Sequence, residues 1–152
     1  MLQVEITGFR SLERQLRDVE AEAKDLSNFI KETAVPLVRK EVKRLFDSGG
    51  YFQWPALAPS TVARKGHSRI LIDTRRLIRS VTLESSADKV IEITDNSLVF
   101  GTNVPYARYH EEGTSRLPKR PVFELLGQHG RFLRRMEIAL DKHFQSRIDA
   151  TD

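Results

Sequence analysis

The stretch "SVTLESSADKVIEITDNSLVFGT", residues 80–102, decides the fold because its apolar residues alternate with polar ones. Alternation with a period of two places the apolar side chains on one face of a strand. Three segments have this pattern, residues 80–86, 89–95 and 97–102, and only one or two residues connect each to the next. Such short connections join antiparallel neighbours. The stretch therefore predicts a three-stranded antiparallel β-meander.

Helical periodicity flanks this meander on both sides. Residues 12–26 and 29–46 repeat apolar positions every three or four residues, and so do residues 129–147 near the C-terminus. Residues 2–6 alternate like a short strand. Pro36 falls inside the second helical pattern, where its missing backbone donor predicts a kink or a break. The order of these segments predicts an α+β fold, a meander packed with long N-terminal and C-terminal helices.

The region between the second helix and the meander is irregular. Residues 48–69 contain aromatic residues and prolines without a long period, so we expect an extended loop with one short helix near residues 59–65. Trp54, the sole tryptophan, is expected to anchor this loop to the core rather than to stack on a nucleotide base. Asp73 or Thr74 can cap a further short helix, although Asp73 could also serve as a salt-bridged anchor.

Composition places the chain among soluble globular domains. Its 152 residues can bury one core, so we treat residues 1–152 as a single domain. The absence of cysteine excludes disulfides, thiolate metal sites and cysteine nucleophiles. No apolar run reaches the ~20 residues of a membrane helix, and the first residues lack the basic start and apolar stretch of a secretory signal. We therefore expect a cytoplasmic product without a membrane partner.

The net charge of +4 is concentrated in one part of the chain. Residues 48–80 contain six basic side chains and one acidic side chain, Asp73, whereas residues 11–47 contain eight of each. The six basic residues, named here the basic segment, are Arg64, Lys65, Arg69, Arg75, Arg76 and Arg79. Such a patch can face phosphate or an acidic protein surface. A solvated face with counter-ions explains it equally well.

The side chains most suggestive of catalysis are His110, Glu111 and Glu112. They end a short helix predicted from Pro105 and stopped by Gly113. Imidazole and carboxylate bind zinc, but a helical zinc pair needs ligands at i and i+4, and position 114 is threonine. Adjacent helical residues also point about 100° apart. Because no other motif specifies a reaction, we expect neither enzymatic activity nor a cofactor.

Three stretches occur in an informative order: "FQWPALAPSTVARK" (52–65), "ILIDTRRLIRSV" (70–81) and "VFGTNVPYARYHEEGTSRLPKRPVF" (99–123). In this order they resemble the phage virion morphogenesis family, the Mu-like tail-completion and neck proteins. The matching residues are Trp54, Leu57, Pro59, Thr61, Lys65, Leu71, Asp73, Thr74, Leu77, Tyr106, Ala107, His110, Gly113, Pro118, Arg120, Pro121 and Phe123. Arg75 stands where that family usually has glycine, so we expect the turn there to have φ < 0.

The resemblance implies a non-enzymatic, tail terminator-like protein of the virion neck, made in the host cytoplasm. It implies a homo-oligomeric ring, expected to be a hexamer, that joins the tail tube to the head. The implied partners are other copies of the chain, the tail tube or sheath protein and the head-tail connector protein. The basic segment would face DNA in the lumen without reading its sequence.

The motif residues near the third stretch are then expected to be structural. Tyr106 and Ala107 would pack a short helix, His110 would form a hydrogen bond near its end, Gly113 would let the chain reverse, and Arg120 would brace the corner. Two alternatives stay open. One is a basic DNA-binding protein that acts outside a ring, and the other is a hydrolase with a metal near His110.

Overall fold

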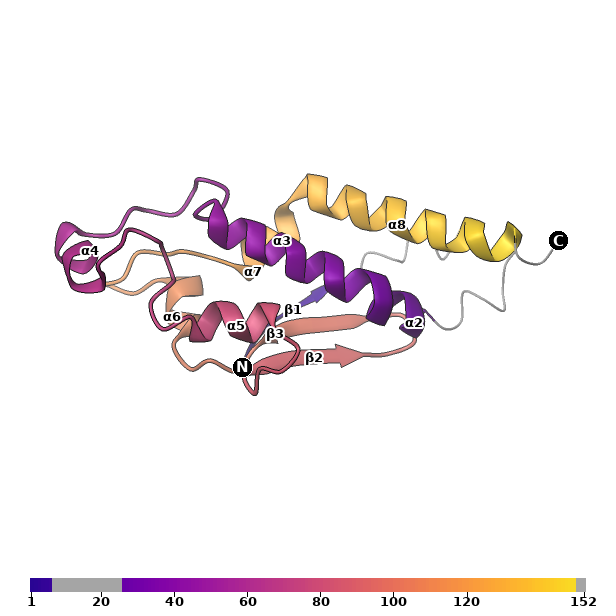
Figure 1. The fold of residues 1–152 in the computed structure, drawn as a ribbon, viewed down its shortest axis with the longest axis horizontal. Coiled ribbons are helices and arrows are strands. Elements are labelled where there is room, and N and C mark those ends of the chain that lie inside the picture. Colours follow the sequence, from indigo (N-terminus) through magenta and orange to yellow (C-terminus); the bar gives the residue numbers. More distant parts are fainter. Residues whose placement is uncertain (7–25, 150–152) are drawn as a thin grey trace.

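The computed structural model describes residues 1–6 and 26–149, which form a three-stranded antiparallel sheet with helices packed around it (Figure 1). The strands are β1 (Leu2–Ile6), β2 (Lys89–Ile93) and β3 (Leu98–Thr102), in the order β1-β3-β2. This architecture confirms the predicted α+β class. The first predicted helix, over residues 12–26, lies outside the described residues except for Leu26.

The first strand of the predicted meander is wrong. Residues 80–82 are the last residues of a helix, α5 (Arg76–Thr82). Leu77, Ser80 and Val81 are all buried, and their spacing of three and four residues is that of one helical face. The alternation of apolar residues beyond position 80 therefore coincides with a helical stripe that starts earlier, at Leu77. In the predicted meander residues 89–95 are the central strand, whereas in the structure β3 is central and β1 takes the place on its other side.

β1 completes the sheet from the opposite end of the chain. Val4 of β1 and Ile91 of β2 both pair with Phe100 of the central strand. Directly opposed residues share a face of the sheet, and Phe100 is almost fully buried, so this face is the core face. Gly101 permits the close approach of β1, because a Cβ atom there would lie 2.3 Å from the carbonyl oxygen of Leu2.

The second predicted helix is continuous but not uniform. It begins as α2 (Ser27–Phe29), widens into one π-helical turn, η1 (Ile30–Ala34), and continues as α3 (Val35–Asp47). Pro36 is the second residue of α3. Because proline has no backbone donor and crowds the preceding turn, a wider turn directly before it is a physical solution. The predicted disturbance is present as a π-helical turn, and the helix does not break.

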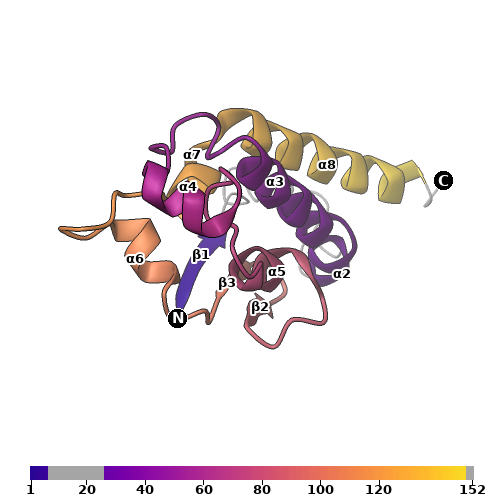
Figure 2. The same cartoon turned by 60° about the vertical axis from the view of Figure 1, so that its left-hand side comes forward.

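α8 (Gly130–Asp149) lies beside α3 over the sheet (Figures 1 and 2). Its range agrees with the predicted C-terminal helix to within two residues at either end. The side chains that it buries in the core are Phe132, Met136, Leu140 and Phe144. They recur at intervals of four, as the predicted apolar stripe requires. No helix in the described part of the chain is long and apolar enough to cross a membrane.

A buried ionic cluster ties α3 to the start of α8. Glu41 is 1% exposed and accepts hydrogen bonds from the Tyr51 hydroxyl at 2.8 Å and from the Arg135 guanidinium. His129 Nδ1 lies 3.3 Å from Glu41 Oε1 without the alignment of a hydrogen bond. The His129 ring stacks on Tyr51 with its centroid 4.1 Å away. Burial, and then the bond to Glu41, raise the pKa of Tyr51, so its hydroxyl remains a donor.

Three short helices complete the described fold. α4 (Pro59–Lys65) interrupts the long loop as predicted, and Gly66 ends it in the left-handed conformation. α6 (Ala107–Glu112) begins two residues after Pro105. α7 (Phe123–Gln128) was not predicted. α4 and α6 lie at the same end of the molecule, far from the C-terminus (Figure 1).

Candidate functional site

Arg120 joins two stretches that lie far apart in the sequence. Its side chain is buried, with Nε donating to the carbonyl oxygen of Pro55 at 2.9 Å and a terminal nitrogen donating to that of Ala56 at 3.0 Å. Its backbone nitrogen donates to the carbonyl oxygen of His110 at 2.7 Å. Burial lowers the pKa of Arg120, but a guanidinium remains charged at neutral pH. The predicted brace is present, and we name residues 113–121 the corner.

Trp54 fastens the same loop to the same corner. Its side chain is buried, and Nε1 donates a hydrogen bond to the carbonyl oxygen of Pro121 at 2.9 Å. The indole also meets the ring of Phe46 edge-on, with a centroid distance of 5.6 Å. The tryptophan is thus an anchor, as predicted, and its face is not open to a nucleotide base.

The end of α6 reverses the chain into the corner. Gly113 has φ of 75°, and a Cβ atom there would lie 3.0 Å from the backbone nitrogen of Lys119. The expected hydrogen bond of His110 is made by its backbone carbonyl, whereas its Nδ1 is buried without a partner among the described residues. Ala107 is buried as expected. Tyr106 is 37% exposed and meets the His110 ring edge-on, so it packs only in part.

Glu111 has a role that sequence reasoning missed. Its Oε2 accepts hydrogen bonds from the backbone nitrogens of Val122 at 2.7 Å and Phe123 at 3.3 Å, and its Oε1 accepts one from Glu124 at 2.8 Å. These are donors of the first turn of α7, which have no partner inside the helix. No local signal could have indicated this cap, because the carboxylate comes from a different helix.

The capping role excludes Glu111 from the metal site considered above. Both of its oxygens are occupied by backbone donors. Within residues 1–6 and 26–149, no group of three or more histidine, aspartate or glutamate side chains is placed to hold a metal ion. The geometry therefore assigns the side chain of Glu111 to folding.

Replacing Glu111 by alanine is expected to lower the free energy of unfolding by about 2 kcal/mol, because three backbone donors lose a charged acceptor. The matched control is Glu112→Ala, since that exposed carboxylate pairs, within residues 1–6 and 26–149, only with Arg108 on the same helix. We expect the control to change stability by less than about 0.5 kcal/mol. Urea denaturation followed by circular dichroism measures both. Equal effects of the two substitutions would contradict the cap.

A hollow of about 370 Å³ lies between α4, the start of α5 and α6. Motif residues from all three resembling stretches line it, although they are distant in the sequence. These residues are Leu57, Thr61, Lys65, Leu71, Asp73, Thr74, Leu77, Tyr106, His110 and Arg120. The hollow is therefore the place where the sequence motifs converge, at the end of the molecule that carries α4 and α6 (Figures 1 and 2).

The structure divides the basic segment into two groups. Arg64, Lys65, Arg75 and Arg76 line the hollow, whereas Arg69 and Arg79 do not. Arg69 lies 3.4 Å from a carboxylate oxygen of Asp47. The Lys65 ammonium donates to the carbonyl oxygen of Arg69 at 2.8 Å. The predicted patch is thus not a uniform cationic surface.

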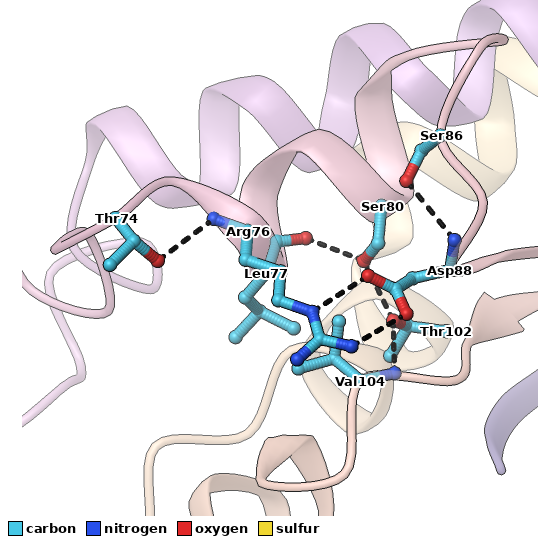
Figure 3. A network of polar contacts seen from close by, with 8 residues as sticks. All are labelled: Thr74, Arg76, Leu77, Ser80, Ser86, Asp88, Thr102 and Val104. Atoms are coloured by element: carbon cyan, nitrogen blue, oxygen red, sulfur yellow. Dashed lines mark hydrogen bonds and ion pairs between the residues drawn. The ribbon is translucent and has the colours of Figure 1, made fainter.

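Arg76 belongs to a polar network that fixes the start of α5 (Figure 3). Its Nε and a terminal nitrogen donate to the two carboxylate oxygens of Asp88 at 2.8 and 2.9 Å. These bonds lower the pKa of Asp88. The backbone nitrogen of Arg76 donates to the Thr74 hydroxyl at 3.4 Å. The network leaves Arg76 less available to an outside partner than its position suggests.

A buried hydroxyl pair extends this network to β3 (Figure 3). The Ser80 hydroxyl donates to the carbonyl oxygen of Leu77, and the Thr102 hydroxyl accepts from the backbone nitrogen of Val104. The hydroxyl oxygens of Ser80 and Thr102 lie 2.7 Å apart. Because the single proton of Ser80 is already used, Thr102 donates to Ser80. The pair fixes α5 against the central strand and leaves neither hydroxyl unsatisfied.

Two expectations for the turn before α5 are wrong. Arg75 has φ of 67°, in the left-handed region, so the turn keeps the conformation that suits glycine although the residue is arginine. Asp73 does not cap α5, because Arg75 occupies the N-cap position and the Thr74 hydroxyl makes the nearby bond.

The hollow has a positive electrostatic character. Burial is the largest cause that lowers the pKa of Lys65, the charges of Arg120 and Arg64 lower it further, and Asp73 opposes them. Burial, followed by Arg120 and Lys65, lowers the pKa of His110. His110 is therefore neutral at neutral pH, and the charge of the hollow comes from its arginines and its lysine.

In comparisons with known protein families, curated proteins and solved structures, none matches the chain.

Proposed function

We propose that the protein is a structural, non-enzymatic component of the phage neck, a tail-completion or tail terminator-like ring subunit that joins the tail tube to the head connector. One observation carries the proposal. The stretches that resemble the phage virion morphogenesis family form a single structural unit, in which Arg120 holds the loop of Pro55 and Trp54 holds the carbonyl of Pro121. Arg120, Trp54 and Pro121, which all match the family pattern, thus all help to hold the loop against the corner.

The sheet offers a means of assembly. Its order β1-β3-β2 places β2 at an edge, and among the described residues β2 pairs only with β3. An edge strand can pair with a strand of another chain. Repetition of one heterologous contact closes a ring, for which we propose six subunits. The tail tube or sheath protein, the connector and DNA in the lumen are the further partners in this proposal.

A second candidate is a basic DNA-binding protein that acts outside a ring. It is favoured by Arg64, Arg75 and Arg79, which are exposed and form no ion pair with any carboxylate of the described residues. Three free cations would bind phosphate with an affinity that falls as salt rises. This candidate predicts that Arg79 contributes to DNA binding although it does not line the hollow.

Light scattering tests the first candidate. The mass of the purified protein is measured across concentration, alone and after mixing with purified tail tubes. A ring that forms alone or on tube ends is the expected result. A monomer or dimer that ignores the tubes at every concentration would overturn the proposal.

Electrophoretic titration of duplex DNA against salt tests the second candidate. Arg79→Ala should then weaken DNA binding and reduce its salt dependence. Arg134→Ala is the matched control, because Arg134 is exposed on α8 and pairs with Glu137. The absence of salt-dependent binding by the unchanged protein would exclude this candidate.

A further inference from the structure

The hollow contains positive charge that the described fold does not use. Arg64 on α4 and Arg75 before α5 both line it, and neither pairs with a carboxylate of residues 1–6 or 26–149. Lys65 stands beside them. Asp73 is the sole acidic residue among those lining the hollow, so an anion that enters meets a surplus of cations. Guanidinium groups bind carboxylates with two parallel hydrogen bonds.

Apolar surface lies beside this charge. Leu57, Leu71 and Leu117 line the hollow from three different segments, and each is only half-buried. Solvent-accessible leucines around one concavity are a favourable surface for an apolar side chain. The phosphates and sugars of a nucleic acid backbone offer no apolar side chain to cover them. The combination therefore favours a peptide that brings both a carboxylate and an apolar side chain.

Two of the four non-glycine residues with positive φ in the described part of the chain line the hollow. Leu71 has φ of 57° and Arg75 has φ of 67°, and both residues line the hollow. Residues other than glycine seldom adopt this conformation, and such outliers are typical of ligand-binding segments. Glycine would take either position without strain. An arginine at position 75 suggests that its side chain has a use that offsets the strain.

We propose that the hollow binds an acidic peptide segment of a partner protein, with a carboxylate against Arg64 and Arg75 and an apolar side chain against the leucines. The argument rests on the contacts and charges of the hollow, and it does not depend on the phage neck proposal. The site is complete in a single chain. Binding can therefore be measured without a ring and without tail tubes.

The test uses a capped, fluorescein-labelled hexapeptide in which aspartate or glutamate alternates with leucine, and it measures fluorescence anisotropy with the full-length protein. We expect saturable binding that weakens about tenfold or more with Arg75→Gly and with Arg64→Ala. Arg79→Ala is the matched control, because Arg79 is a free, exposed cation on α5 that does not line the hollow. It should leave the affinity within about twofold.

Two further peptides separate the contributions of charge and apolar contact. Asparagine and glutamine in place of the acids should abolish measurable binding, and alanine in place of leucine should weaken it. Arg75→Gly should keep or raise the melting temperature, because glycine accepts φ > 0 without strain. Its loss of binding therefore cannot come from unfolding.

Three results would overturn the inference. The neutral peptide could bind as well as the acidic one. Arg79→Ala could weaken binding as much as Arg75→Gly, which would indicate diffuse charge rather than a site. A short DNA duplex could displace the peptide at lower concentration than unlabelled peptide does, which would assign the hollow to phosphate.

Discussion

Replacing Arg120 by alanine is expected to lower the free energy of unfolding by about 4 kcal/mol. Hydrogen bonds from a charged donor contribute roughly 1.5–3 kcal/mol each, and Arg120 makes two of them, to the carbonyl oxygens of Pro55 and Ala56. Pro55 and Ala56 are themselves exposed, so water can hydrate the freed carbonyls, and the expected loss stays in the lower half of the sum of the two bonds. Urea denaturation, followed by the fluorescence of Trp54 and by circular dichroism, measures the change.

Arg116→Ala is the control for this prediction, because Arg116 lies in the same corner with an exposed side chain. Its effect should stay within about 0.5 kcal/mol. Arg120→Lys should fall between the two, since an ammonium keeps the charge but lacks the planar fork that reaches both carbonyls. If Arg120→Ala and Arg116→Ala had equal free energies of unfolding, the contacts of the Arg120 side chain would not stabilise the fold.

Replacing Glu41 by alanine is expected to lower the free energy of unfolding by about 3–5 kcal/mol. Hydrogen bonds to a charged acceptor contribute roughly 1.5–3 kcal/mol each, and solvent offsets part of the loss at Arg135, whose side chain is 41% exposed. Here the Arg135 guanidinium and the Tyr51 hydroxyl both lose their acceptor. Because the cluster links α3 to the start of α8, we expect the contacts of α8 to loosen first. Amide hydrogen exchange along α8, together with urea denaturation, measures this.

Glu137→Ala is the matched control for Glu41, because Glu137 is an exposed carboxylate on α8 whose ion pair with Arg134 spans 3.6 Å. Such surface pairs contribute about 0–1 kcal/mol. Glu41→Gln should be intermediate, since the amide can still accept from the Tyr51 hydroxyl. Protection of α8 that is unchanged by Glu41→Ala would show that the cluster does not fasten this helix.

Elements whose signal is local were predictable from the sequence. The hairpin of β2 and β3 follows from two alternating segments and a short turn, and α8 follows from a long apolar stripe. α4 follows from Pro59 at its start and Gly66 at its end. In each case one short window contains both the periodicity and the residues that stop it.

Elements that depend on distant partners were not predictable. Residues 80–82 satisfy both a strand pattern and a helical one, and the packing of α5 against β3, through Ser80 and Thr102, decides between them. α7 is short, and its cap comes from Glu111 on another helix. The positive φ of Arg75 could not be predicted either, because residue propensity assigns that conformation to glycine and not to arginine.

The candidate site, too, was only partly predictable from the sequence. The motifs pointed to Arg120 and Trp54 as structural residues, and their contacts agree with that interpretation. The sequence did not indicate that these motifs surround a hollow, because the lining comes from three stretches. Nor could it separate Arg79 from Arg75, since both are arginines in one basic segment and only the fold places one of them at the hollow.

The topology of the sheet has a consequence for synthesis on the ribosome. Leu2 pairs with Thr102, so β1 is made about 100 residues before the strand with which it pairs. At translation rates of 5–20 residues per second, β1 waits roughly 5–20 s before β3 exists. The β2 and β3 hairpin closes within microseconds of its emergence. No sheet can form before β3 has been made, because β3 is the central strand with which both β1 and β2 pair. The backbone donors and acceptors of β1 therefore stay without their sheet partner until about two thirds of the chain has been made.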